Sequence, residues 1–163
     1  MRSQPSVHPT TFNSAEWDLL VRLPGQIVVA STSAEADSPR RTVAEGLAGL
    51  DAIAAGLDSP NPLVRRVVGM IYAERDDDAP AAEEFDDRAV GLAGVLATCR
   101  LAATLLGTRC PPGDLEAYAG WLRAIADRVT HASRSGGVLG IGGAHVSAAE
   151  QQFLVDLDRA LGG

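Results

Sequence analysis

The sequence predicts an all-α protein, a single-domain bundle of about six to seven helices, and three observations support that prediction. Apolar side chains recur every three or four positions in most segments, which is the spacing of one helical face. Proline, glycine, serine and aspartate separate these segments. Residues 87–107 are apolar or small on almost every face, and such a helix belongs at the centre of a bundle. We therefore expect residues 14–163 to fold around this central helix, and the polar, aperiodic residues 1–13 to form a flexible arm.

The first helical pattern begins after Ser14, a good N-cap residue, and runs to about residue 22. Leu23-Pro24-Gly25 follows, and we expect it to end this helix because proline has no backbone N–H. Pro24 can equally be the first residue of a second, short helix that carries Ile27, Val28, Val29 and Ala30. The β-branched content of 26–30 leaves a strand as the alternative, but no similar run exists to pair with it.

The next helix begins either at Pro39, with Ser38 as its cap, or at the capping box Thr42–Glu45. It extends to about residue 55. Its large apolar positions are Val43, Leu47, Leu50 and Ile53.

Glycines interrupt this helix at Gly46 and Gly49, and each costs roughly 1 kcal/mol relative to alanine. We expect close packing against a neighbouring helix to offset that cost. The small positions Gly91 and Gly94 of the central helix are the partners that we favour.

Asn61-Pro62 pairs a cap residue with a proline and predicts an amphipathic helix over residues 63–75. The acidic residues 76–87 that follow lack the ligand spacing of a calcium loop, so we interpret most of them as a solvated connection. The central helix then contains Arg100. We expect its charged end to reach water along the aliphatic stem, with burial against Glu45 or Asp51 as the alternative.

Two helices are predicted at the end of the chain. Asp114 is placed to cap a helix over residues 115–133, and the capping box Ser147–Glu150 predicts a last helix over 148–161. The glycine-rich segment between them is compatible with a small hairpin over residues 138–147.

Composition excludes several classes of function. The formal net charge is −7, so neither nucleic acid nor an anionic membrane surface is an expected partner. The two cysteines, Cys99 and Cys110, do not have metal-ligand spacing, and no signal-peptide pattern opens the chain. We expect a cytoplasmic protein without a metal or another cofactor, and a homodimer or a complex with a protein partner.

The C-terminal quarter resembles a family of small, alanine-rich bacterial proteins that end in a glycine-rich motif, a Val-Ser-x-x-Glu motif and a short leucine helix. The matching residues here are Gly136, Gly137, Val138, Leu139, Gly140, Ile141, Gly142, Gly143, Val146, Ser147 and Glu150. This family has no assigned activity, so the resemblance implies a helical fold. A weaker likeness is to tellurite-resistance TerB-like domains, which are associated with metal binding. The Ala-Asp-Gly acidic turn of those domains is not reproduced in this chain, where Ala34-Glu35-Ala36-Asp37 stands nearby.

Three functional hypotheses follow. We favour a non-enzymatic interaction module, because no nucleophile–base set is visible and the small-residue faces suit helix docking. The second is an anion binder or enzyme that uses backbone amides of the glycine loop before a helix N-terminus. The third is a TerB-like metal-responsive domain that uses Asp37, Asp76, Asp77 or Asp78. The residues of the second hypothesis are Gly136, Gly137, Gly140, Gly142, Gly143, His145 and Ser147, with His131 and Glu150 as further polar groups.

Overall fold

The computed structural model describes residues 12–34, 39–73, 87–135 and 146–163, and the predicted all-α bundle is confirmed there. The strand alternative for residues 26–30 is wrong, because these residues are helical. The predicted hairpin over 138–147 falls, except for its last two residues, outside the described ranges. The elements are α1 (Ser14–Ser33), α2 (Pro39–Ala54), the short 3₁₀ turn η1 (Ala55–Asp58), α3 (Pro62–Ala73), α4 (Arg88–Arg109), α5 (Pro112–Ser135) and α6 (Ala148–Ala160).

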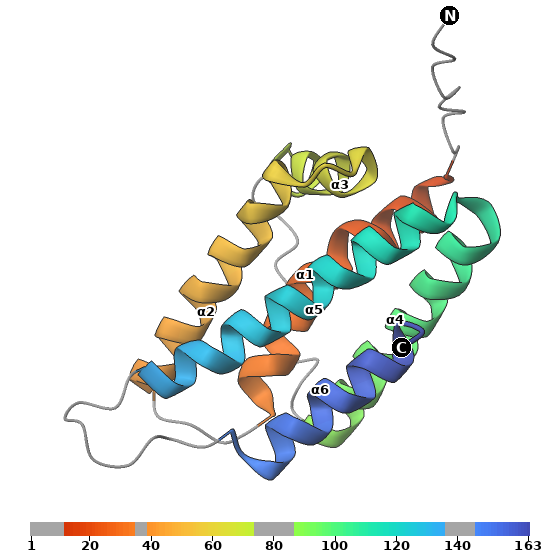
Figure 1. Ribbon diagram of the computed structural model, residues 1–163. Coiled ribbons are helices and arrows are strands. Elements are labelled where there is room, and N and C mark those ends of the chain that lie inside the picture. Colours follow the sequence, from red (N-terminus) through yellow and green to blue (C-terminus); the bar gives the residue numbers. More distant parts are fainter. Residues whose placement is uncertain (1–11, 35–38, 74–86, 136–145) are drawn as a thin grey trace, which may run out of the picture.

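Helices α1 and α5 form the centre of the bundle. In Figure 1, α5 crosses the middle of the molecule, with α2 on one side and the pair α4 and α6 on the other. Helix α1 packs along α5 and also contacts α2, α3 and α4. Large side chains of both helices, such as Leu23, Ile27, Leu122 and Ile125, are fully buried. The core therefore forms around the two helices that bury the largest apolar side chains.

Helix α4 lies at the edge of the bundle, which corrects the predicted central position of residues 87–107. Its buried residues are Val95, Cys99, Ala102 and Leu106. The side chains of Val90 and Leu101 remain 66% and 61% exposed. Alanine and glycine supply much of the apolar character of this helix, and they offer little area to bury. Arg100 is exposed, as we favoured.

Helix α1 continues through Pro24, where the sequence predicts a break. A proline has no N–H, so the carbonyl of Leu20, four residues earlier, loses its usual helical donor. The Tyr118 hydroxyl of α5 donates a hydrogen bond of 2.8 Å to that carbonyl. Pro24 and Tyr118 are both buried. A side chain from the neighbouring helix thus replaces the missing donor and allows one long helix in place of two short ones.

The glycines of α2 pack differently from our expectation. A Cβ atom at Gly49 would lie 2.6 Å from a Val28 methyl group of α1 and 3.2 Å from a Val129 methyl group of α5. Close packing is therefore correct for Gly49, but its neighbours are α1 and α5. A Cβ atom at Gly46 or Gly94 would meet nothing within 4 Å. The expected contact between the two glycine faces is wrong.

Local capping patterns predicted the starts of α3 and α6 correctly, whereas Asp114 lies in the first turn of α5, which begins at Pro112, and is not its cap. Asn61 Oδ1 accepts hydrogen bonds from the backbone N–H groups of Leu63 and Val64, and Pro62 is the first residue of α3. The Asn61 amide also donates to Asp114 Oδ1 at 2.8 Å, which ties the start of α3 to the start of α5. The capping box of α6 forms as predicted between Ser147 and Glu150.

The start of α1 lies close to the predicted position, but its cap is Asn13 and not Ser14. Asn13 forms a capping box with Glu16, with N···O distances of 2.8 Å and 2.9 Å. Phe12 is buried and meets the Trp17 ring edge to face at a centroid distance of 5.0 Å. These two residues of the predicted arm therefore contact the bundle.

Candidate functional site

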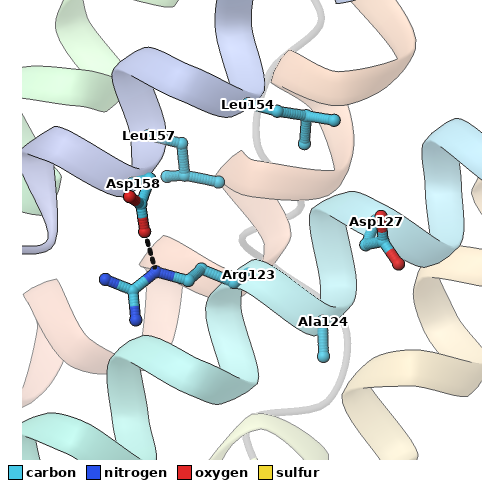
Figure 2. A pocket seen from close by; sticks show the side chains of 6 residues that line it. All are labelled: Arg123, Ala124, Asp127, Leu154, Leu157 and Asp158. Atoms are coloured by element: carbon cyan, nitrogen blue, oxygen red, sulfur yellow. Dashed lines mark ion pairs between the residues drawn. The ribbon is translucent and has the colours of Figure 1, made fainter. Parts of the chain in front are cut away.

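An open groove of about 320 Å³ lies between α5 and α6. Figure 2 shows Arg123 of α5 facing Asp158 of α6, with Leu154 and Leu157 along the α6 side. The Arg123 Nε atom lies 2.7 Å from Asp158 Oδ1, so the lining guanidinium is already paired. No serine, cysteine or histidine is among the described residues that line the groove. The groove therefore lacks a nucleophile that a neighbouring base could activate.

A second open groove, of about 540 Å³, lies where the start of α1 meets α3. Trp17 and Met70 give it an apolar wall, and Ser14 and Asp18 give it a polar rim. The guanidinium carbon of Arg66 stands 4.5 Å from the centre of the Trp17 ring, a cation–π contact. Among the described side chains that line it, Ser14 is the only hydroxyl and none is a histidine. Because the groove is open and has an apolar wall, it suits a contact surface better than a reaction site.

Two ionisable side chains near the centre, Cys99 and Tyr118, are buried and have raised pKa values. Burial raises the pKa of the Cys99 thiol to about 12, and Arg100 opposes that shift only in part. Burial also raises the pKa of the Tyr118 hydroxyl well above its ordinary value, and this hydroxyl donates to the Leu20 carbonyl. A reactive cysteine needs a lowered pKa and exposure, and Cys99 has neither. We infer structural roles for both side chains.

Most of the predicted glycine-loop site lies outside the described ranges, namely Gly136, Gly137, Gly140, Gly142, Gly143 and His145. Ser147 is described. Its hydroxyl accepts from the Glu150 N–H at 3.1 Å, and its own N–H donates to the Glu150 carboxylate at 2.8 Å. His131 is exposed on α5, with Nδ1 2.7 Å from the Asp127 carbonyl oxygen. Ser147 and Glu150 thus serve the start of α6, and His131 bonds within its own helix.

The metal hypothesis has no support in the residues that the structure describes. Within these ranges, no three histidine, cysteine, aspartate or glutamate side chains lie close enough to hold a metal ion. The acidic positions that this hypothesis requires, Asp37, Asp76, Asp77 and Asp78, all fall outside the described ranges.

The outer face of α2 and of the η1 turn that follows it carries a row of exposed apolar side chains, which we name the α2 stripe. Val43, Leu47, Leu50 and Leu57 are 63%, 60%, 58% and 48% exposed, and the partly buried Ala54 completes the row. On the opposite face, Glu45, Gly49, Ala52 and Ile53 are buried. Of the four large apolar positions predicted for this helix, only Ile53 is in the core. The α2 stripe is therefore a concentrated apolar surface of the kind that marks interaction sites.

Sequence reasoning missed this surface, although a signal was present. Its positions alternate in steps of four and three residues from Val43 to Leu57, which is the 3.5-residue spacing of a helix-pairing seam. A buried face produces a similar pattern, and Ala52, Ile53 and Gly56 form one on the other side of the same segment. The periodicity shows two apolar faces, and only the fold distinguishes the covered face from the exposed one.

Helix α4 offers a second exposed apolar face, built mainly from small residues. By length and composition it is the one helix among the described residues that is long and apolar enough to span a membrane, a test that apolar helices of soluble proteins also pass. Arg100 lies near its middle, and a charge at the centre of a bilayer costs several kcal/mol. Exposed Ala93, Gly94 and Ala97 offer less area than the leucines of the α2 stripe.

Comparison of the chain with protein-family models, with curated proteins and with solved structures returned no significant match. The functional argument therefore rests on the surfaces and side chains described above.

Proposed function

We propose that the protein is a non-enzymatic interaction module that binds another polypeptide through the α2 stripe. The observation that supports this proposal most directly is the exposure of four large apolar side chains in one row along α2 and η1, opposite the buried face of the same segment. Covering the exposed half of each side chain would contribute about 1 kcal/mol. A helical partner with its own apolar row fits this convex surface, because helices pack by interlocking rows of side chains.

The polar chemistry of the described residues also supports a binding role. Ser147 and Glu150 form a helix cap, and Arg123 is paired with Asp158. The Cys99 thiol is buried and has a raised pKa. A serine or cysteine nucleophile needs a base within hydrogen-bonding distance. The first groove has no such nucleophile among its described lining residues, and in the second the Asp18 carboxylate beside Ser14 is paired with Arg22 at 2.9 Å.

Native mass spectrometry of the freshly purified full chain tests this proposal, before any chelator is added. We expect a species heavier than the monomer whose added mass is polypeptide. That species should disappear when Leu47 and Leu50 are both changed to serine, because the centre of the α2 stripe is then polar. The matched control is Leu101→Ser, since Leu101 of α4 is equally exposed, at 61%.

A monomer in the native spectrum of the unaltered protein would contradict the proposal, whether or not a small ligand adds to its mass. A stoichiometric small-molecule mass on that monomer would favour the glycine-loop binder. If the assembly persists in the Leu47→Ser/Leu50→Ser variant and dissociates in Leu101→Ser, the binding surface is on α4 and not on the α2 stripe.

A further inference from the structure

We propose that the second groove, where the start of α1 meets α3, binds the N-terminal segment of the same chain, with Val7 and Pro9 against Trp17 and Met70. This inference goes beyond the proposed function, because it concerns a different surface from the α2 stripe. Three observations support it: the point where the chain enters the bundle, the apolar wall of the groove, and the sequence pattern of residues 1–11.

The chain enters the bundle at the edge of this groove. Phe12 is buried, and its ring meets the Trp17 ring at a centroid distance of 5.0 Å. Trp17 is itself part of the groove wall. Asn13 forms the capping box of α1 with Glu16, through hydrogen bonds of 2.8 Å and 2.9 Å. These contacts fix the chain at Phe12, so residues 1–11 are tethered beside the groove.

The tether selects this segment over other occupants. An extended chain advances about 3.3 Å per residue, so Pro9 and Val7 reach about 10 Å and 17 Å from Phe12. The groove follows one turn of α1, from Ser14 to Asp18, which is about 6 Å along the helix axis. A short tether gives an effective concentration on the order of millimolar. At a micromolar protein concentration, the chain's own segment therefore has an advantage of roughly a thousandfold over the same segment of a second copy.

The sequence of residues 1–11 suits an apolar groove. Pro5, Val7 and Pro9 alternate with polar residues, and side chains two positions apart share one side of an extended chain. Each proline has a fixed φ and restricts the residue before it to extended conformations. Binding therefore costs less conformational entropy than it would for a segment without prolines. Aromatic-lined grooves are known binding sites for extended, proline-containing segments.

The groove presents a matching surface from two helices. Trp17 of α1 and Met70 of α3 are partly buried against the core and form the apolar wall. Arg66 lies one helical turn before Met70, and its guanidinium carbon stands 4.5 Å from the centre of the Trp17 ring, which helps to hold the ring in place. The oxygen atoms of Ser14 and Asp18 on the rim can accept hydrogen bonds from backbone N–H groups of an extended segment.

Photo-cross-linking of the full chain tests the position of the segment. A benzophenone side chain reacts on irradiation with C–H bonds close to it, so Val7→p-benzoylphenylalanine reports what lies beside position 7. Peptide mapping by mass spectrometry should show a cross-link to the peptide that contains Met70, in protein of monomer mass. The matched control is Ser6→p-benzoylphenylalanine, on the other side of an extended segment, and it should give a several-fold lower yield of that cross-link.

Equal yields from positions 6 and 7, or cross-links without preference for the Met70 peptide, would overturn the inference. A Met70 cross-link found only at twice the monomer mass would also overturn it, because the segment then binds the groove of a second copy. A protein that is monomeric in the native spectrum and still forms the Met70 cross-link would support this inference while contradicting the proposed function. The two proposals can therefore fail separately.

A double-mutant cycle measures the same contact through stability. Urea unfolding compares the original protein with Val7→Ser, Met70→Ser and their combination. We expect Val7→Ser to raise the unfolding equilibrium constant by a factor of about two or more in the original protein, and clearly less in Met70→Ser. The matched control is Val155→Ser, since Val155 is 46% exposed on α6 and its change should have the same effect in both backgrounds. Equal effects of Val7→Ser with and without Met70 would overturn the contact.

Discussion

The hydrogen bond between Tyr118 and the Leu20 carbonyl explains how a buried proline is accommodated inside α1. Removing the hydroxyl in Tyr118→Phe leaves that carbonyl buried without its donor, and we expect a loss of about 1–3 kcal/mol in the free energy of unfolding. In a Pro24→Ala background, the new N–H of residue 24 reaches the same carbonyl. The loss caused by Tyr118→Phe should then be clearly smaller, which urea unfolding of the four proteins would measure as a coupling energy.

Tyr72→Phe is the matched control for this cycle, because Tyr72 is 49% exposed on α3 and its change should have little effect. Equal losses from Tyr118→Phe with and without Pro24 would show that the hydroxyl does not compensate for the proline.

The raised pKa of Cys99 predicts that the free energy of unfolding falls at alkaline pH. An unfolded chain ionises this thiol above its ordinary pKa of 9.0, whereas the folded chain keeps it protonated until about 12. Because the unfolded state releases its proton first, the stability contributed by Cys99 is intact below pH 9 and is lost between pH 9 and 12. The loss reaches up to about 4 kcal/mol. Tyr118, whose pKa is also raised, adds to the loss above its ordinary pKa of 10.0.

Urea unfolding at several pH values between about 8 and 11 measures this effect in the original protein and in Cys99→Ala. The variant should be less stable at pH 8, because it leaves a cavity, and should lose less stability as the pH rises. The same pH slope in both proteins would exclude Cys99 as a source of the alkaline loss.

Helix α2 contains two glycines with different surroundings: Gly49 is packed against α1 and α5, whereas there is open space beside Gly46. Gly46→Ala should raise the free energy of unfolding by up to about 1 kcal/mol, since alanine favours the helix and its Cβ meets no neighbour within 4 Å. Gly49→Ala should lower it, because the new Cβ would lie 2.6 Å from a Val28 methyl group.

Thermal unfolding of both variants at a low protein concentration, where we expect the monomer to dominate, gives the comparison directly. Shifts of the same sign for the two variants would contradict the packing described for α2.

Local signals predicted the elements better than they predicted the contacts between them. Asn61-Pro62 and the Ser147–Glu150 box determine helix starts through atoms within four residues, so their sequence is sufficient. The continuity of α1 through Pro24 depends on Tyr118, which lies far away in the chain. No pattern near Pro24 contains that information. The same is true of Leu47 and Ile53, which have similar apolarity but opposite exposure.

At the scale of the whole molecule, the helix that the sequence places at the centre lies at the edge. Apolar residues on every side of α4 show that this helix could be buried. They do not show that burying α4 would stabilise the fold more than burying another helix. Helices α1 and α5 bury larger side chains, including Ile27, Tyr118 and Leu122, and so occupy the middle. The predicted glycine-loop site lies mainly outside the described residues and stays a prediction.

Arg100 should limit association through the edge that α4 forms. It is exposed next to Leu101, and its helix α4 lies on the other side of the bundle from α2 (Figure 1). Changing it to leucine would enlarge the apolar face, and we expect light scattering to rise with concentration beyond that of the original protein. Arg128→Leu, at an exposed position of α5, is the control and should scatter like the original protein. Scattering that rises equally in both variants would indicate a general loss of solubility.

The opposite placement of α2 and α4 also bears on how far an assembly of this protein could grow (Figure 1). A particle with one self-complementary edge stops growing at two copies, whereas a particle with two such edges can add copies at both ends and form a linear polymer. Helix α4 exposes Val90 and Leu101, and Arg100 is the exposed charge beside Leu101. The difference between a bounded pair and an open-ended fibre would then depend on one side chain.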